Sequence, residues 1–413
     1  MVTVWWSSAG VIQHSFLPNG VSITADVYCE ELNTMMEKLA HLQPALVNRS
    51  SPLLLHDNAK IDEQLKRPLT RSGNYAWTFY QSLQEIWDWL DKTHQDYPNV
   101  VTLVTIGESV ENRPIRGVKI DFRKRDNPVI GMIEGGIHAR EWISPATVTY
   151  IINEFLTSSD PDVRLIAENI VWHIFPVVNP DGYEYTFSHT NTCSVRESKP
   201  RHATQQSIAQ SLRQLSSIYI SITAVGASQN PCDETFAGPI EFSEPESRAI
   251  ANYVTAIKEE GNMVYYFAFH SYSQMVLVPF SHLQGAEVLE APNYTDMIAI
   301  RGMDKLKEQH DTNYRVGTSA DILYEVSGSS FDWVKGVAEI PIVYLFELRD
   351  VGEHGFLLPN SRIIPNNQEI MAGLVEMEKV TRGMGYYNIE RTSSGGKAVF
   401  SFVLLVLGIF VAM

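Results

Sequence analysis

The sequence predicts an α/β fold, and three observations carry this prediction. From residue 73 onward, helical hydrophobic patterns alternate with short apolar runs that are typical of strands, as expected for a sheet covered by helices. Hydrophobic residues make up 44% of the chain and aromatic residues 10%, which is enough to fill a globular core. The length of 413 residues allows one large α/β domain plus additional material, or two to three smaller domains.

The first helix of this pattern is marked by a capping box at its start. Ser82 and Glu85 have the required spacing, and Pro98 ends the apolar repeat that follows. The apolar positions in between recur at helical spacing and are Leu83, Ile86, Trp87 and Leu90. Strand-like runs follow over residues 100–106 and 128–133.

The later elements continue the alternation. Ser144 and Pro145 open a helix that extends to about Phe155, because proline is favoured in a first helical turn. A second capping box over Ser243–Glu246, with Pro245 inside it, begins another helix. Its apolar stripe is formed by Ile250, Tyr253, Val254 and Ile257. Further strands are expected over 170–178, 264–269 and 341–346. We interpret these stripes as core packing.

Charge and cysteine content exclude several function classes. The net charge of −16 argues against a nucleic-acid partner, because phosphate binding needs a basic surface. The three cysteines, Cys29, Cys193 and Cys232, are too few and too scattered for a disulfide scaffold or a cysteine zinc site, and at most one pair can form.

The two ends of the chain differ in character. The N-terminal residues show no basic segment followed by an unbroken apolar run, so they do not resemble a signal peptide. Residues 398–413 form a charge-free apolar tail of 16 residues, which would span about 24 Å as a helix and fall short of a bilayer core of about 30 Å. Two interpretations stay open: the tail contacts a membrane as an anchor signal, or it is spurious or cleaved.

A short histidine and glutamate pair suggests a metal site. His138 and Glu141 are three residues apart, so both side chains can converge on one point from a tight turn. Gly135 and Gly136 precede them and permit a sharp path from a strand end to a helix start. Such a pair is common by chance, and on spacing alone a surface or core histidine is the more frequent explanation.

Several longer motifs resemble the pancreatic-type (A/B) zinc metallocarboxypeptidases. They match in order over about residues 73–385 and comprise 135–145 (GGIHAREWISP), 179–183 (NPDGY), 270–274 (HSYSQ), 346–350 (FELRD) and 355–359 (GFLLP). The resemblance implies a single large α/β domain with a central mixed, mostly parallel sheet flanked by helices. It also implies a monomer that binds one zinc ion, acts on peptide or protein C-termini and is secreted.

The same resemblance assigns roles to individual residues. It implies that His270 is the third zinc ligand beside His138 and Glu141, although an isolated histidine at the end of an apolar strand is more often part of the core. Glu347 corresponds to the general base that takes a proton from zinc-bound water. The alternative for Glu347 is a structural salt bridge to Arg349 or another cation.

Three further residues match the substrate site of the family. Arg140 matches a substrate-binding arginine, with a solvated loop cation as the alternative, and Tyr324 matches a mobile tyrosine that folds over bound substrate. Phe331 stands where the family has its specificity residue. Because phenylalanine carries no charge, the resemblance implies an A-like preference for aromatic or aliphatic terminal residues. Phe331 could instead be plain core.

The resemblance fails over residues 186–224. The family carries an oxyanion-stabilising arginine and an Asn-Arg pair that clamps the terminal carboxylate of the substrate in this segment, but this chain has no Asp-x-Asn-Arg sequence there. Arg196 approximates the oxyanion arginine by position only. The abrupt return of the motifs near Val225 suggests a shifted reading frame or an altered exon. We therefore expect intact zinc binding with weakened exopeptidase activity, or a non-catalytic zinc- and peptide-binding homologue.

The first 62 residues resemble a fragment of a mariner-type transposase. The motifs are 4–6 (VWW), 46–49 (LVNR) and 56–60 (HDNAK), and the resemblance makes Asp57 one of three catalytic acids, without the following acid motif. We interpret the segment as a fused remnant, and an atypical pro-segment is the alternative. A transposon-derived DNA-binding protein is disfavoured by the acidity of the chain. The expected segments are 1–62, a linker at 63–72, the catalytic domain at 73–388, a polar linker at 389–397 and the tail at 398–413.

Overall fold

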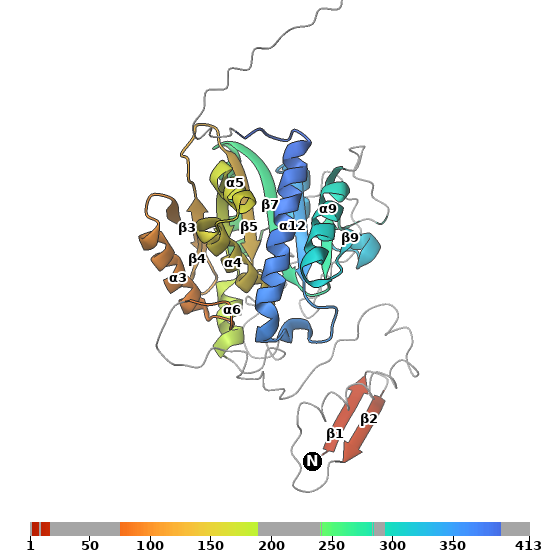
Figure 1. Cartoon of the computed structure of the whole chain (residues 1–413). Coiled ribbons are helices and arrows are strands. Elements are labelled where there is room, and N and C mark those ends of the chain that lie inside the picture. Colours follow the sequence, from red (N-terminus) through yellow and green to blue (C-terminus); the bar gives the residue numbers. More distant parts are fainter. Residues whose placement is uncertain are drawn as a thin grey trace, which may run out of the picture. The chain divides into compact units, whose positions relative to one another are not determined.

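The computed structural model describes residues 2–7, 10–16, 75–188, 240, 242–282, 284 and 294–389. Two compact units are distinguished, residues 1–59 and 60–413, and each is described by itself. The second unit contains an eight-stranded sheet in the order β3-β4-β6-β5-β7-β10-β8-β9 (Figure 1). Its strands are β3 (Val101–Glu108), β4 (Pro114–Ile120), β5 (Val129–Gly135), β6 (Ile170–Phe175), β7 (Asn262–Ser271), β8 (Met275–Val278), β9 (Arg315–Thr318) and β10 (Ile342–Leu348).

The centre of the sheet is parallel and its margins are mixed. Strands β6, β5, β7 and β10 run parallel to one another, whereas β4 pairs antiparallel with β3 and β6, and β8 pairs antiparallel with β10. The central strands are buried almost throughout, as expected for strands covered on both faces. This arrangement confirms the predicted α/β class with a mixed, mostly parallel sheet flanked by helices.

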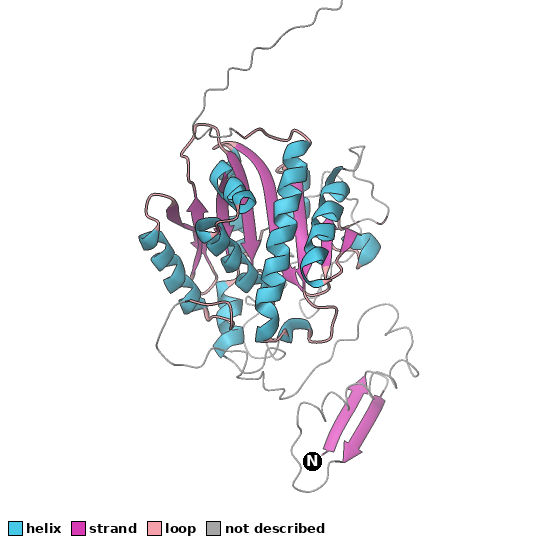
Figure 2. Ribbon diagram, in the orientation of Figure 1, coloured by secondary structure: helices cyan, strands magenta, loops and turns pink. Residues whose placement is uncertain are grey.

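One face of the sheet carries the larger apolar cluster. In Figure 2 a layer of helices lies across the strands on this face, and side chains from α4, α5, α9 and α12 fill the cluster together with those of α3. The helices are α3 (Leu83–Asp96), α4 (Ile143–Thr157), α5 (Pro161–Asn169), α6 (Pro180–Ser188), α9 (Tyr294–His310) and α12 (Ile363–Gly383). Burial of this apolar face is the main source of stability for the fold.

A second apolar cluster occupies the opposite face. It combines side chains of β5, β6 and β7 with those of α8 (Pro245–Lys258) and α11 (Ser330–Gly336). Short elements complete the unit: α10 (Ser319–Ile322), η3 (Gly355–Leu357) and η4 (Asn360–Arg362). The sheet is therefore the middle of three layers.

The N-termini of α3 and α8 test the two capping boxes predicted from the sequence. The Ser82 hydroxyl accepts a hydrogen bond from the Glu85 amide and the Glu85 carboxylate accepts one from the Ser82 amide, so the first predicted capping box is confirmed. The prediction of a second capping box at Ser243–Glu246 is wrong. Glu244 occupies the N-cap of α8, and Ser243, one residue earlier, donates its hydroxyl to Glu244 Oε1 at 3.1 Å. Proline at the first helical position still sets the start of α8.

The first unit contains one described element pair. Strands β1 (Val2–Ser7) and β2 (Gly10–Phe16) pair antiparallel, with an irregularity between Trp5 and Trp6. Asp57 and the apolar tail at 398–413 lie outside the described residues. Within the described part of the chain, no helix combines the length and apolar character needed to cross a membrane.

Candidate metal centre

The predicted ligands meet at the carboxyl ends of neighbouring parallel strands. His138 and Glu141 follow the end of β5, His270 is the ninth residue of β7, and Glu347 lies near the end of β10. His270 and Glu347 are direct partners in the parallel register of β7 and β10. Parallel strands bring their carboxyl ends to one edge, which is where ligands bind in open α/β sheets.

The turn from β5 to α4 depends on glycine. Gly136 has a φ of +62°, and a Cβ atom there would lie 3.0 Å from both the Pro176 carbonyl oxygen and the Val177 Cα. The Gly136 amide donates to the Ser144 hydroxyl at 3.0 Å, and this hydroxyl donates in turn to the Phe269 carbonyl. Ser144 therefore ties the ligand turn to β7 one residue before His270.

The three ligand side chains point their donor atoms at one another. Glu141 Oε1 lies 2.7 Å from His138 Nδ1, Glu141 Oε2 lies 3.2 Å from His270 Nδ1, and the two histidine Nδ1 atoms are 3.1 Å apart. Glu141 and His270 are buried, and Glu141 Oε2 has no hydrogen-bond partner in the described part of the chain. Two histidines and one carboxylate form a donor set that suits catalytic zinc, which takes three protein ligands. The residues present therefore fit a zinc ion.

The electrostatics of the cluster favour an ionised carboxylate at Glu141. Burial opposes ionisation of Glu141, but the His138 and His270 rings outweigh it and hold the pKa of Glu141 at about 2. Burial lowers the pKa of His270, although the Glu141 carboxylate opposes this effect. Metal binding needs deprotonated imidazole and carboxylate groups, so both shifts favour the ligand state.

Glu347 has the environment of a carboxyl group that can hold a proton. Burial, followed by the negative charge of Glu141, raises the pKa of Glu347 well above its usual value. The salt bridge to Arg349 considered above does not form. The Arg349 guanidinium binds Glu369 instead, with Nε donating to Glu369 Oε1 at 2.7 Å. Glu347 therefore stands beside the ligand cluster without that cation.

The expected substrate residues lie at different depths. Tyr324 is 62% exposed, whereas Phe331 is buried on α11. The Arg140 guanidinium carbon lies 4.0 Å from the centre of the Phe356 ring, so Arg140 is a stacked cation and not a freely solvated one. Arg196 and most of the aberrant segment at 186–224 lie outside the described residues.

A buried acid near the site was not anticipated from the sequence. Glu134 is fully buried in β5, four residues before His138, and Ser330 Oγ donates to its Oε1 at 2.8 Å. Burial raises the pKa of Glu134 to about 7. Its position one residue before the Gly135-Gly136 turn was the available signal, but Ser330 lies 196 residues away in sequence.

Comparison with known proteins agrees with this geometry. Residues 86–373 match the family described as zinc carboxypeptidase, and residues 1–49 match a transposase (partial DDE domain). A zinc carboxypeptidase of Simulium vittatum is 41% identical over 75% of this chain and 99% of the relative. A carboxypeptidase B of Astacus astacus is 36% identical over 72% of this chain and 95% of the relative.

Solved structures show the same fold. The bovine thrombin-activatable fibrinolysis inhibitor, solved with a tick carboxypeptidase inhibitor, superposes with a TM-score of 0.63 at 28% identity and covers 74% of this chain and 99% of that one. The carboxypeptidase A of Helicoverpa armigera superposes with a TM-score of 0.64 at 24% identity, covering 87% of this chain and 83% of that one. The family match includes all eight strands of the larger sheet and all three ligands. The chain belongs to the zinc carboxypeptidase family.

Proposed function

We propose that this chain is a zinc-dependent exopeptidase that hydrolyses the C-terminal peptide bond of peptides or proteins. The observation that carries the proposal is the convergence of His138, Glu141 and His270 beside Glu347 at the ends of three adjacent parallel strands. Zinc bound by the three ligands would polarise the scissile carbonyl and lower the pKa of a water molecule. Every other step is assigned to side chains of the protein.

Glu347 is the proposed general base. Its raised pKa suits a group that takes a proton from the attacking water and passes it to the leaving amine. Tyr324 is exposed and is proposed to close over bound substrate, and Arg140 is proposed to bind the peptide, with its guanidinium held over the Phe356 ring. Arg196 is the candidate to stabilise the oxyanion.

We propose an A-like preference for aromatic or aliphatic terminal residues. Phe331 carries no charge and packs in the apolar cluster with Trp333 and Val334, so it offers nothing to pair with a terminal lysine or arginine. Named relatives include both A-type and B-type enzymes, so the names do not decide the preference. Replacing Phe331 with aspartate is expected to lower the rate with a C-terminal-Phe peptide.

A second candidate function is a weakly active or non-catalytic zinc- and peptide-binding homologue. The observation that favours it is the segment at 186–224, which has no Asp-x-Asn-Arg sequence. Loss of a bidentate, charge-assisted carboxylate clamp would weaken substrate binding by about 2–3 kcal/mol. A transcript that reads through this segment in frame with strong support would contradict the idea of a shifted frame.

One experiment separates the two candidates. Zinc content and hydrolysis of a C-terminal-Phe peptide are measured on the full chain, with and without a chelator, and beside the variant Glu347→Gln. A competent enzyme binds one zinc, loses activity with chelator and loses about 100- to 10,000-fold in kcat in the variant, because the general base is removed. Zinc binding without hydrolysis selects the non-catalytic homologue. Failure to bind zinc contradicts both.

The last proposals concern the segments of the chain, its oligomeric state and its location. We propose that residues 1–62 are a fused transposase-like remnant, that residues 73–388 form the catalytic domain and that the protein acts as an extracellular monomer. The match of residues 1–49 to a transposase supports the first assignment. Mass spectrometry of the native protein tests it, since peptides from residues 1–62 would be recovered only if this segment is part of the mature chain.

A further inference from the structure

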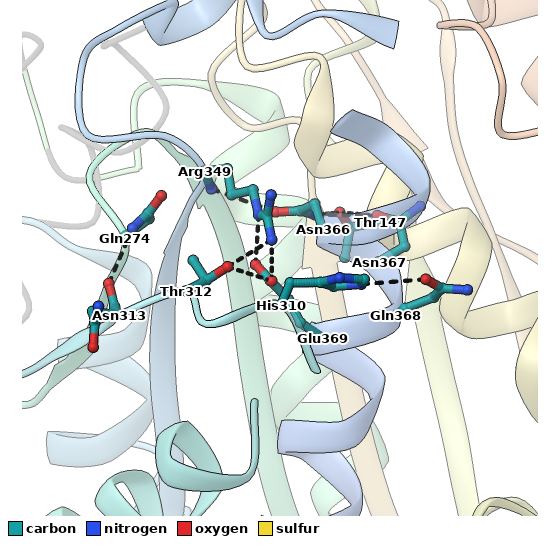
Figure 3. A network of polar contacts seen from close by, with 10 residues as sticks. All are labelled: Thr147, Gln274, His310, Thr312, Asn313, Arg349, Asn366, Asn367, Gln368 and Glu369. Atoms are coloured by element: carbon teal, nitrogen blue, oxygen red, sulfur yellow. Dashed lines mark hydrogen bonds and ion pairs between the residues drawn. The ribbon is translucent and has the colours of Figure 1, made fainter. Parts of the chain in front are cut away.

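A set of buried polar residues joins α4, α12 and the end of β10 (Figure 3). Thr147, Asn366, Asn367 and Glu369 are fully buried, and Arg349 and Thr312 are nearly so. We call these six residues the α12 polar network, because three of them lie in the first half of α12. Buried polar groups are costly unless they are hydrogen-bonded, and the contacts within this network meet that need.

One side of the network holds the strand end that carries Glu347. Arg349 follows Glu347 by two residues, just beyond the end of β10. Its Nε donates to Glu369 Oε1 at 2.7 Å, and its Nη2 donates to Glu369 Oε2 and, at 2.6 Å, to Thr312 Oγ1. Thr312 Oγ1 also donates to Glu369 Oε2 at 2.7 Å. A bidentate ion pair of this kind fixes orientation as well as distance.

The other side of the network reaches the helix that follows the metal ligands. Asn366 Oδ1 accepts from the Arg349 amide at 3.4 Å, and Asn366 Nδ2 donates to Thr147 Oγ1 at 2.9 Å. Thr147 Oγ1 donates to Asn367 Oδ1 at 2.8 Å. Thr147 lies in α4, which begins two residues after the ligand Glu141. Consecutive hydrogen bonds therefore join the ligand segment to the Glu347 strand end through α12.

The network can act on Glu347 through the position of the strand end, not through its charge. The Arg349 charge is neutralised by Glu369, and the raised pKa of Glu347 is caused by burial and by Glu141. Apolar contacts around the strand are non-directional, whereas hydrogen bonds of fixed geometry can set the place of a strand end.

We propose that the α12 polar network is a positioning device that sets Glu347 relative to the metal-ligand segment. The inference rests on the proposed function, in which Glu347 is the general base. Arg349 and Glu369 are positioning residues, since their side chains bind one another and Thr312 rather than a metal ligand. A displacement of about 1 Å in such a group can cost about 100-fold in rate, so loosening the network should lower turnover before it affects substrate binding.

The first test compares two buried acids of the same helix. Glu369 accepts hydrogen bonds from an arginine and a hydroxyl, and so does Glu378, which binds Arg382 Nε at 2.8 Å and Tyr387 Oη at 2.6 Å. In the full zinc-loaded chain, Glu369→Gln is expected to lower kcat by about 10- to 100-fold with KM within twofold. The matched control Glu378→Gln is expected to keep kcat within twofold of the wild type.

The second test does not depend on hydrolysis. Thr147→Val removes the hydroxyl that joins α4 to α12, and Thr149→Val is the matched control, because Thr149 is equally buried in α4 but its hydroxyl accepts from Trp77 Nε1 at 3.0 Å. Each variant is loaded with Co²⁺, whose visible absorption bands report the geometry of its ligands. Thr147→Val should shift these bands, and Thr149→Val should retain the wild-type spectrum.

The outcomes are distinct. The proposal is supported when Glu369→Gln loses turnover and Thr147→Val shifts the cobalt bands while both controls match the wild type. It is overturned when Glu369→Gln behaves like Glu378→Gln, or when Thr147→Val keeps the wild-type spectrum. If the wild type binds zinc but hydrolyses no peptide, the proposed function is wrong, and the cobalt spectra of the threonine variants alone decide on the network.

Discussion

Two groups of three potential ligands occur in the described residues, and they differ in almost every physical respect. His138, Glu141 and His270 come from the ends of two central strands, and two of the three are buried. Asp350, Glu353 and His354 come from one loop, and the last two are exposed. In both groups the ligand atoms lie within 4.8 Å of one another, so mutual distance alone does not separate them.

The hydrogen bonding of the buried carboxylate oxygens distinguishes the two groups. Both oxygens of Asp350 are engaged by backbone amides, with Oδ1 accepting from Gly352 and Gly355 and Oδ2 from His354. In the first group Glu141 Oε2 is buried without a hydrogen bond and faces the His270 ring. A buried carboxylate whose acceptors are already satisfied by its own loop has little to offer a cation, whereas an unsatisfied buried carboxylate between two imidazoles gains from one.

The largest expected effect tests the first group. Replacing His270 with alanine removes one of three ligands and should lower zinc affinity by at least about 1,000-fold, or about 4 kcal/mol, more than the loss of an outer hydrogen-bond partner. Zinc should raise the Tm of the wild type, because it binds the native state, and should leave the variant unchanged. Titration with a competing zinc chelator measures the affinity. Wild-type affinity in the variant would remove His270 from the site.

Two of the three ligands have a local signal in the sequence, whereas His270, 129 residues after Glu141, was assigned only through the family resemblance. The glycines at 135 and 136, the three-residue spacing of His138 and Glu141, and the strand before them are all readable over a few residues. The partner of Arg349 was not readable in this way, since Glu369 lies 20 residues downstream and Thr312 lies 37 residues upstream. The α8 cap was missed because Ser243 is a favoured N-cap residue, whereas the path of the chain places Glu244 at the N-cap without a side-chain cap hydrogen bond.

Three strands away from the centre of the sheet could not be recognised from hydrophobic periodicity. Strands β8 and β9 have four residues each, and β4 begins at a proline, so none gives a long alternating pattern. Their places in the sheet are set by pairing with distant strands, such as Met275 opposite both Glu347 and Arg315. Sequence reasoning therefore identified the parallel centre of the sheet and the edge strand β3, but not β4, β8 and β9.

Glu246 is a buried acid that lies outside both groups of potential ligands. Burial, followed by backbone hydrogen bonds that oppose it and by the charges of Asp181 and Glu244, leaves the pKa of Glu246 raised to about 7. A raised pKa in the folded state means that Glu246 is protonated at low pH, and that stability is lost as pH rises from about 4.5 through about 7. Glutamine cannot ionise, so Glu246→Gln should remove this loss.

The expected size of that effect is up to about 3 kcal/mol between pH 5 and pH 8, from the 1.36 kcal/mol that accompanies each pKa unit. Urea unfolding of the metal-free wild type and variant at both pH values measures it. Taking the difference between the two pH values within each protein cancels any change in packing caused by the substitution. Parallel pH curves for the two proteins would show that Glu246 does not titrate in this interval.

The smallest expected effect tests the second group. The double variant Glu353→Gln, His354→Ala should bind zinc with wild-type stoichiometry and affinity within twofold, and its free energy of unfolding should change by less than about 0.5 kcal/mol, as is usual for exposed positions. The His354 amide still donates to Asp350 after the substitution, so the loop keeps its internal hydrogen bonds. A fall in zinc stoichiometry from two to one would show instead that exposed ligands of this loop hold a second ion, and that unsatisfied acceptors are not what distinguishes the two groups.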